Sequence, residues 1–231
     1  MDPVLQEQIA YYRARAPEHD EWLRRQGRYD LGEEENARWR AELEEVVGAL
    51  ASFGPRGRVL ELAGGTGFWT ELLVHTTDEL TVVDASPESL DINRSRVGNS
   101  RARYLAADLF EWEPDQAYDS VAFAFWLSHV PPVRFDGFWD LVARCLAPGG
   151  RVFFVDNLNP SSTAHDHRRL EPGEVTVTRA LNDGREFRIY KLFYRPDELA
   201  RLLEARGWRA DVRASPTYFL YGQATRATVG V

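Results

Sequence analysis

A glycine-rich turn follows an apolar run early in the chain. The run Val-Leu-Glu-Leu covers residues 59–62, and Ala-Gly-Gly-Thr-Gly follows at 63–67. Because glycine lacks a Cβ atom, such a turn lets a ligand lie against the main chain, and the next helix offers unpaired N–H groups. A dinucleotide fingerprint begun at Gly65 needs glycine where Thr70 stands, and no Gly-Lys-Ser/Thr phosphate loop is present. The turn therefore predicts a ligand site that carries neither phosphate motif.

An acidic residue ends the second apolar run. Asp84 closes residues 80–84 and lies seventeen residues beyond Gly67. A carboxylate at that position can accept hydrogen bonds from both hydroxyls of a ribose. The alternative is a capping aspartate in front of the helix that Ser86 and Pro87 begin.

The motif at the turn resembles that of a methyltransferase family. The pattern E-x-A-x-G-x-G at 61–67 looks like the E-x-G-x-G-x-G of class I S-adenosylmethionine-dependent methyltransferases, with Ala63 at the first glycine position. The segments 84–86, 107–109 and 146–150 resemble the later motifs of that family in order and spacing. The resemblance implies S-adenosylmethionine (SAM) as the cofactor, S-adenosylhomocysteine (SAH) as its product, and a Rossmann-like fold.

The same resemblance assigns roles at the cofactor. It implies that Asp84 holds the ribose and that Asp108, with Leu109 beside it, faces the adenine amino group. It also implies that Gly65 and Gly67 lie alongside the methionine moiety. The full set of candidate cofactor-binding residues is Tyr12, Arg15, Ala63, Gly64, Gly65, Gly67, Trp69, Asp84, Ala85, Ser86, Asp108, Leu109, Phe125 and Trp126.

Two aromatic residues end the fourth strand-like run. Phe125 and Trp126 would wall the sulfonium, because an aromatic face attracts a cation. Their alternative role is packing in the core. Tyr11, Tyr12 and Arg15 fall on a predicted helix that could close over the cofactor and contact its carboxylate, or could simply pack on the sheet.

The likeness extends to an actinobacterial group of small-molecule methyltransferases that includes the phosphonate O-methyltransferase of dehydrophos biosynthesis. The matching segments are 11–16, 108–112, 126–131 and 183–191. The likeness covers nearly the whole chain from Tyr11 onward and is poorest over 22–52 and 157–174. We expect those two segments to contact the substrate.

The acceptor's charge decides which residues are needed. A phosphonate or carboxylate oxygen is already anionic, so a cationic clamp suffices, and Arg179, Arg188 and Lys191 could supply it. Arg188 and Lys191 point to opposite faces of an ideal strand. The resemblance places a hairpin lysine near the substrate, which favours Lys191, and implies a lid tyrosine, for which Tyr29 is the nearest match. The alternative is a set of solvated strand charges. With Tyr11, these three cations are the candidate substrate-binding residues.

A neutral alcohol, phenol or amine would instead need a base. His129, just past the fourth strand, is the best placed, although it could equally orient the loop before Pro131. The candidate catalytic residues are therefore His129, Lys191 and Tyr29. His165 and His167 could form a mobile base or a weak metal site, but such loop clusters are more often solvated.

No metal is predicted. Asp156 and Asn157 follow the fifth strand-like run, as in the metal-dependent catechol methyltransferases. Those enzymes also use an acid at the end of the fourth strand, where Phe125 and Trp126 stand here. An oxygen-rich magnesium site would therefore be incomplete.

The elements that must position these residues alternate along the chain. The predicted strands are 58–62, 80–84, 102–106, 120–125 and 151–156, and the helices between them begin near 69 and cover 87–97 and 135–146. Two helices, the second over 33–52, precede them. A hairpin of 174–181 and 185–194 turns at Asn-Asp-Gly, and helix 196–206 and strands 208–213 and 218–223 complete the chain. This pattern predicts an α/β fold with a seven-stranded sheet whose last strand is antiparallel.

Length and composition limit the class of protein. The 231 residues suit one methyltransferase domain over 1–231, with an N-terminal helical lid at 1–54 and a substrate-side insertion at 157–194. The formal net charge of −8 disfavours nucleic acid and anionic lipid as partners. Cys145 is the only cysteine, and no run is long and apolar enough for a membrane span. We expect a cytoplasmic protein, monomeric or homodimeric, that binds a small molecule.

Three functions remain open from the sequence. The leading hypothesis is SAM-dependent O-methylation of a small anionic metabolite, a phosphonate or a carboxylate. The close alternative is methylation of a neutral hydroxyl or amine with His129 as the base. The third is a module that binds the cofactor without catalysis.

Overall fold

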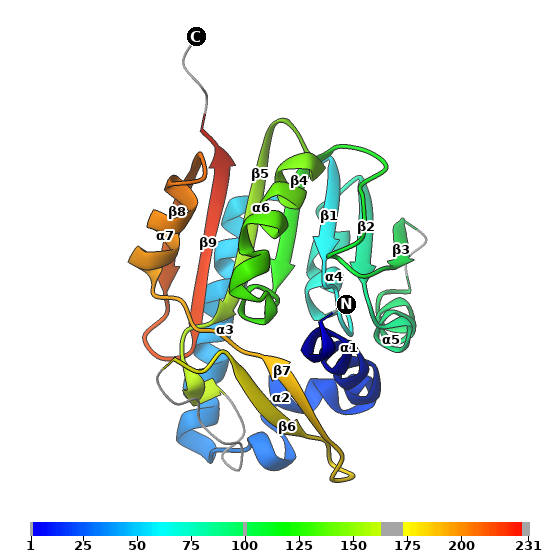
Figure 1. Ribbon diagram of the computed structural model, residues 1–231, viewed down its shortest axis with the longest axis vertical. Coiled ribbons are helices and arrows are strands. Elements are labelled where there is room, and N and C mark those ends of the chain that lie inside the picture. Colours follow the sequence, from blue (N-terminus) through cyan, green and yellow to red (C-terminus); the bar gives the residue numbers. More distant parts are fainter. Residues whose placement is uncertain (1, 99–100, 163–172, 228–231) are drawn as a thin grey trace.

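The central sheet has seven strands in the order β3-β2-β1-β4-β5-β9-β8 (Figure 1). The structure is a computed structural model that describes residues 2–98, 101–162 and 173–227. The strands are β1 (Arg58–Leu62), β2 (Glu79–Asp84), β3 (Ala102–Ala106), β4 (Tyr118–Ala124), β5 (Leu146–Asn157), β8 (Trp208–Ala214) and β9 (Phe219–Arg226). Strands β1 to β5 run parallel, and β9 is antiparallel to both of its neighbours. The predicted fold class is confirmed.

Helices cover both faces of this sheet. Successive side chains of a strand point to opposite faces, so Val59 and Leu60 enter different apolar clusters. The Val59 side packs against α3 (Glu33–Phe53), α4 (Phe68–Val74) and α5 (Pro87–Val97), whereas the Leu60 side packs against α6 (Phe135–Cys145) and α7 (Pro196–Glu204). Burial on both faces explains why the parallel strands read as apolar runs.

Strand order reverses between β1 and β4, and this sets where a ligand can bind. Strands β2 and β3 lie on one side of β1, whereas β4 and β5 lie on the other. In open α/β sheets, ligands bind outside the carboxyl ends of the strands at such a switch point. The predicted glycine-rich turn follows β1 and therefore lies at this position.

A separate two-stranded sheet lies beyond the carboxyl ends of the central strands. Strands β6 (Thr176–Ala180) and β7 (Glu186–Tyr190) form an antiparallel hairpin. The helix α1 (Pro3–Arg15) packs on it through an apolar cluster of Tyr11, Val177, Leu181 and Ile189. Figure 1 shows α1, α2 (His19–Arg24) and the hairpin gathered at the same end of the molecule.

Some element boundaries differ from the sequence-based expectation. Three α-helices, rather than two, precede β1 in the described residues, because a 3-10 turn at Ala16–Glu18 containing Pro17 separates α1 from α2. The hairpin strands are shorter than predicted. Residues 148–150, expected as a turn between the predicted helix 135–146 and strand 151–156, belong to β5. The pairing of β5 with β4 shifts register between Tyr118 and Ser120.

No helix in the described residues is both long and apolar enough to cross a membrane.

The helix-start signal predicted from Ser86 and Pro87 is present, since the Ser86 side chain accepts a hydrogen bond from the Ser89 N–H at the first turn of α5. This cap fixes the residue at which α5 begins after β2.

Candidate active site

The glycine-rich turn is held by the acid predicted to bind ribose. The Asp84 carboxylate accepts the Gly65 N–H at 2.9 Å and the Ser86 N–H at 2.8 Å. Burial raises the pKa of Asp84, and the two N–H donors oppose that rise. The carboxylate is therefore fixed by main chain at the carboxyl end of β2, beside the turn that follows β1.

Close packing beneath the turn explains its glycines. A Cβ atom at Gly64 would lie 2.3 Å from the Val82 side chain, and one at Gly67, where φ is +95°, would lie 2.7 Å from Asn93. The Asn93 amide donates to the carbonyl oxygens of Gly64 and Gly65. The turn can therefore pack against Val82 and Asn93 only with glycine at these positions.

A buried acid of the motif supports the turn from below. Glu61 in β1 is 2 % exposed and accepts a hydrogen bond from the Thr70 hydroxyl at 2.6 Å. Asn93 donates to the same Thr70 oxygen at 2.7 Å. Burial raises the pKa of Glu61 to about 8, so this side chain is protonated at neutral pH.

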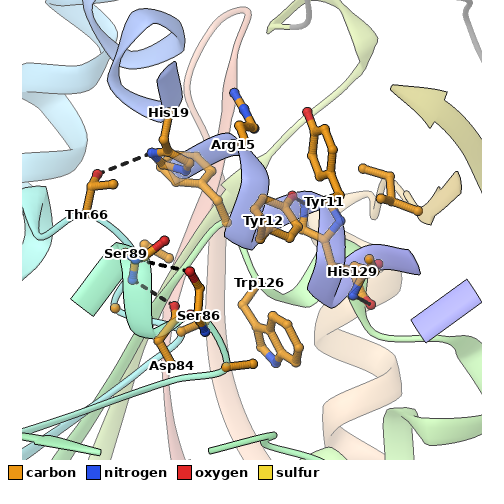
Figure 2. Close-up of a pocket in the computed structure, with 18 of the residues that line it drawn as sticks. Tyr11, Tyr12, Arg15, His19, Thr66, Asp84, Ser86, Ser89, Trp126 and His129 are labelled. Atoms are coloured by element: carbon orange, nitrogen blue, oxygen red, sulfur yellow. Dashed lines mark hydrogen bonds between the residues drawn. The ribbon is translucent and has the colours of Figure 1, made fainter. Parts of the chain in front are cut away.

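One cavity connects the carboxyl ends of β1, β2, β4 and β5 with the N-terminal helices (Figure 2). Every candidate cofactor-binding residue predicted from the sequence lines it: Tyr12, Arg15, Ala63, Gly64, Gly65, Gly67, Trp69, Asp84, Ala85, Ser86, Asp108, Leu109, Phe125 and Trp126. Figure 2 shows Tyr12 lying between His129 and the Asp84–Ser86 end of β2. A single space thus collects residues that are more than a hundred positions apart in the sequence.

Aromatic side chains form two parts of the cavity wall. Phe125 has a left-handed backbone (φ +54°), and its ring packs edge-on against Trp22 with ring centres 4.6 Å apart. Trp126 packs against Phe110, which follows the predicted adenine residues Asp108 and Leu109, with ring centres 5.5 Å apart. Both predicted aromatic residues therefore reach the cavity, Phe125 beside Trp22 of α2 and Trp126 beside Phe110.

Three buried cations also line the cavity. Arg15, Arg179 and Lys191 line it and are 9 %, 6 % and 5 % exposed. Arg15 donates to the Tyr29 hydroxyl at 3.2 Å, and Arg179 donates to the Thr178 carbonyl oxygen at 3.3 Å. Of the three, Lys191 alone forms an ion pair within the described ranges, with its Nζ 3.8 Å from Asp156 Oδ1.

His129 lines the cavity but both of its ring nitrogens are engaged. Nδ1 lies 2.7 Å from the Tyr190 carbonyl oxygen, which can only accept, so Nδ1 carries the proton. Nε2 then accepts the Tyr12 hydroxyl at 2.7 Å. Burial, followed by the charge of Lys191, holds the pKa of His129 well below its usual value. The imidazole is therefore neutral and has no free lone pair for a substrate proton.

Other candidates are distributed between the cavity and the surface. Tyr11 and Tyr29 line the cavity and are buried. Arg188 lies outside the cavity on the exposed side of β7, where its guanidinium pairs with Glu7 at 2.6 Å. The structure therefore does not bring Arg188 to the predicted substrate site, and strand alternation is the reason. His165 and His167 lie outside the described residues.

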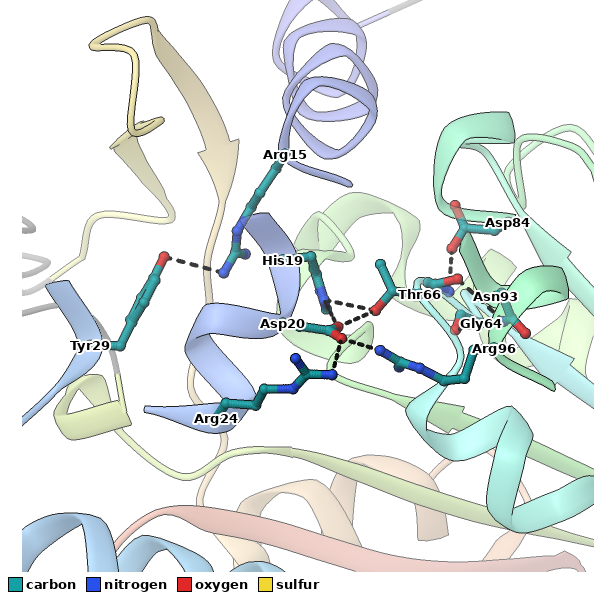
Figure 3. Close-up of polar contacts among 11 residues, drawn as sticks. Arg15, His19, Asp20, Arg24, Tyr29, Gly64, Thr66, Asp84, Asn93 and Arg96 are labelled. Atoms are coloured by element: carbon teal, nitrogen blue, oxygen red, sulfur yellow. Dashed lines mark hydrogen bonds and ion pairs between the residues drawn. The ribbon is translucent and has the colours of Figure 1, made fainter. Parts of the chain in front are cut away.

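A polar cluster at α2 was not predicted from the sequence (Figure 3). The Thr66 hydroxyl of the glycine-rich turn donates to Asp20 Oδ1 at 2.6 Å and lies 3.3 Å from His19 Nδ1. Asp20 also pairs with Arg96 of α5. These partners are far apart in the sequence, so no local sequence pattern predicts their contacts.

Gln8 could have been predicted. It is 2 % exposed, donates to the His129 carbonyl oxygen and accepts the Tyr190 N–H. Its spacing from Tyr12 and Arg15 in the sequence puts all three on one face of α1.

No cluster of three His, Cys, Asp or Glu side chains within the described ranges could hold a metal ion. Asp156, one of the pair considered for magnesium, accepts the N–H groups of Ser128 and Asn157 at 2.7 Å each. Each carboxylate oxygen of Asp156 thus accepts a hydrogen bond from the protein's own main chain.

A family model for the methyltransferase domain matches residues 31–211 of this chain. The chain belongs to that family. The matched range contains the glycine-rich turn, Asp84, the aromatic pair and the hairpin. Among solved structures, DhpI in complex with SAH is 37 % identical over 97 % of this chain and 98 % of its own, with a TM-score of 0.77. A DhpI-SAM-HEP complex is 39 % identical over 97 % and 99 %, with a TM-score of 0.79.

Curated relatives are more distant. A demethylmenaquinone methyltransferase of Tropheryma whipplei is 29 % identical over 76 % of this chain and 74 % of its own length. A ubiquinone biosynthesis O-methyltransferase of Bordetella avium is 31 % identical over 68 % of this chain and 63 % of its own. These similarities confirm the enzyme class predicted from the sequence, a SAM-dependent methyltransferase that resembles DhpI.

Proposed function

We propose that the protein transfers the methyl group of SAM to an oxygen of a small anionic metabolite, a phosphonate or a carboxylate. The observation that carries this proposal is the group of buried cations, Arg15, Arg179 and Lys191, in the wall of the cavity. Lys191 lies near Asp156, whereas Arg15 and Arg179 form no ion pair within the described ranges. Buried charge without a counterion is costly, so these two arginines favour anions in the cavity. The likeness to DhpI over nearly the whole chain supports the same class of enzyme.

The cofactor occupies the β1 to β4 side of the cavity in this proposal. Asp84 accepts the ribose hydroxyls, Asp108 and Leu109 face the adenine, and the turn at 63–67 passes the methionine moiety. Arg15 binds the cofactor carboxylate. This arrangement leaves Arg179 and Lys191 for the acceptor.

The reaction needs alignment more than acid–base chemistry. An acceptor oxygen donates an electron pair to the methyl carbon, the bond from that carbon to sulfur breaks, and the sulfonium becomes the neutral thioether of SAH. An anionic oxygen has no proton to lose, so no base is required. The protein binds and orients the acceptor and excludes water.

The domain organisation follows the same assignment. Within a single methyltransferase domain over 1–231, residues 1–54 form a helical lid through α1 and α2, and 157–194 form a substrate-side insertion through the hairpin. Tyr29 is part of this lid, and its hydroxyl accepts a hydrogen bond from Arg15.

Methylation of a neutral hydroxyl or amine is the second candidate, and the name of the Bordetella avium relative, a ubiquinone biosynthesis O-methyltransferase, favours it. Such a reaction calls on His129 as the base, but its Nε2 already accepts the Tyr12 hydroxyl and its pKa is lowered. A non-catalytic cofactor-binding module is disfavoured by membership of a methyltransferase family.

Matched acceptors and variants test the proposal. Acceptors that share one carbon skeleton but carry a phosphonate, carboxylate, hydroxyl or amine are incubated with labelled SAM. We expect the anions to be methylated, and Lys191→Met and Arg179→Met to raise the KM for them by about tenfold or more. Arg188→Met is the control, because Arg188 lies outside the cavity. Methylation of only the neutral acceptors, or equal effects of all three variants, would contradict the proposal.

A further inference from the structure

Lys191 is the only lysine in the sequence, although lysines and arginines together number 28. It directly follows β7, is 5 % exposed and lines the cavity. An arginine presents a planar guanidinium that stays charged, whereas a lysine presents a compact ammonium whose pKa responds to its surroundings. The one position with a lysine is therefore a position at which the surroundings decide the charge.

Two buried residues contact this ammonium. Lys191 Nζ donates to Ser128 Oγ at 2.8 Å and lies 3.8 Å from Asp156 Oδ1. Ser128 is 1 % exposed and Asp156 is 3 % exposed, and neither lines the cavity. They stand behind the lysine, on the side away from an acceptor.

The main chain fixes both partners. The Ser128 N–H donates to Asp156 Oδ2 at 2.7 Å, and its carbonyl oxygen accepts the Leu192 N–H at 2.8 Å. Asp156 Oδ1 accepts the Asn157 N–H at 2.7 Å. Ser128 is thus held to the residue after Lys191 and to Asp156, so the hydroxyl and the carboxylate have fixed positions around the ammonium.

Apart from Asp156, the charged and titratable neighbours of Lys191 do not favour its charged form. Burial, then Arg179 and Arg15, lower the pKa of Lys191 to about 8, and Asp156 is the group that raises it. His129 is neutral and contributes no negative charge. The ring of Phe193, 5.4 Å from Nζ, adds a weak attraction.

We propose that Ser128 and Asp156 are positioning residues that keep the Lys191 ammonium charged and in place at the cavity wall for an anionic acceptor. The need for that charge rests on the proposed function. The position and charge of the lysine can be measured without any acceptor.

Nuclear magnetic resonance of the single lysine tests the proposal. Protein labelled with ¹³C-lysine has one ε-methylene signal, and its titration reports the pKa of Lys191. We expect a midpoint near 8 for the unmodified protein. Ser128→Ala removes the acceptor of the ammonium and Asp156→Asn removes the nearby negative charge, so each should lower the midpoint by about one pH unit. Ser120→Ala, at a serine of β4 that is also 1 % exposed, should leave it unchanged.

A midpoint like that of an exposed lysine, or one that Ser128→Ala and Asp156→Asn leave unmoved, would overturn the proposal. Ser128→Ala alone decides the test if Asp156→Asn fails to fold. The kinetic counterpart is a rise of about tenfold in the KM for an anionic acceptor with kcat nearly unchanged. If only neutral acceptors are methylated, the proposed function fails, while the titration still decides whether these two residues position Lys191.

Discussion

Ala63 adopts a left-handed backbone conformation, with φ at +54°, at the point where β1 enters the glycine-rich turn. A residue with a Cβ atom pays a steric penalty there that glycine avoids. We predict that Ala63→Gly raises the free energy of unfolding by up to about 1 kcal/mol, a gain in Tm of about 2 °C.

Thermal unfolding of Ala63→Gly and of Ala51→Gly measures this difference. Ala51 lies in α3 and is exposed, so glycine there should lower the free energy of unfolding by about 1 kcal/mol. A fall in Tm for both variants would show that the turn gains nothing from glycine at position 63.

Glu61 couples stability to pH. Its pKa is about 8 in the folded protein and near 4.5 in the unfolded chain. Between these values the unfolded chain has released the proton that the folded protein keeps, so stability falls as pH rises through this window. We predict that Glu61→Gln reduces the loss of Tm between pH 5 and pH 8 by a few degrees.

Thermal unfolding curves recorded across this pH range measure the change in Tm. Glu71→Gln changes an exposed acid of α4 and should follow the unmodified protein. The same pH dependence in both glutamine variants would show that Glu61 does not couple stability to pH.

At the scale of elements, α2 depends on contacts rather than on its own length. It spans six residues, which is too short for stability in isolation. Asp20 joins it to Thr66 of the turn and to Arg96 of α5 (Figure 3). We predict that Arg96→Met speeds hydrogen exchange over residues 16–30, by about tenfold, with little change in Tm.

Hydrogen–deuterium exchange with mass spectrometry measures this effect. Arg94→Met is the matched control, because Arg94 lies in the same helix but pairs with Asp91. Unchanged exchange over residues 16–30 in Arg96→Met would mean that the ion pair does not hold α2.

The sequence predicts those elements whose signals are local. The alternation of apolar strands and helices and the Ser86-Pro87 helix start are read directly, because short-range patterns decide them. The position of α2 against the glycine-rich turn escapes such patterns, since α2 is held by Arg96, 76 residues from Asp20. His129 shows the same limit. Its position past β4 suggests a base, but its partners, Tyr12 and the Tyr190 carbonyl oxygen, come from distant elements.

For the molecule as a whole, the formal net charge of −8 contrasts with the cations of the cavity. An anionic acceptor gains nothing from the overall charge and must be held by local contacts. In the proposed function, α1 and the hairpin, which lie at the carboxyl ends of the strands, provide these contacts (Figure 1). The proposed acceptor site depends on where SAM binds, because that site is defined relative to the sulfonium.

Isothermal titration calorimetry with SAH tests that claim most directly. We predict one SAH bound per chain, with affinity at least about tenfold weaker for Asp84→Asn, which loses the charged acceptor for the ribose hydroxyls. Asp91→Asn, at an exposed acid of α5, should bind as the unmodified protein does. No binding of SAH, or equal affinity for the unmodified protein and Asp84→Asn, would contradict the placement of the cofactor at this turn.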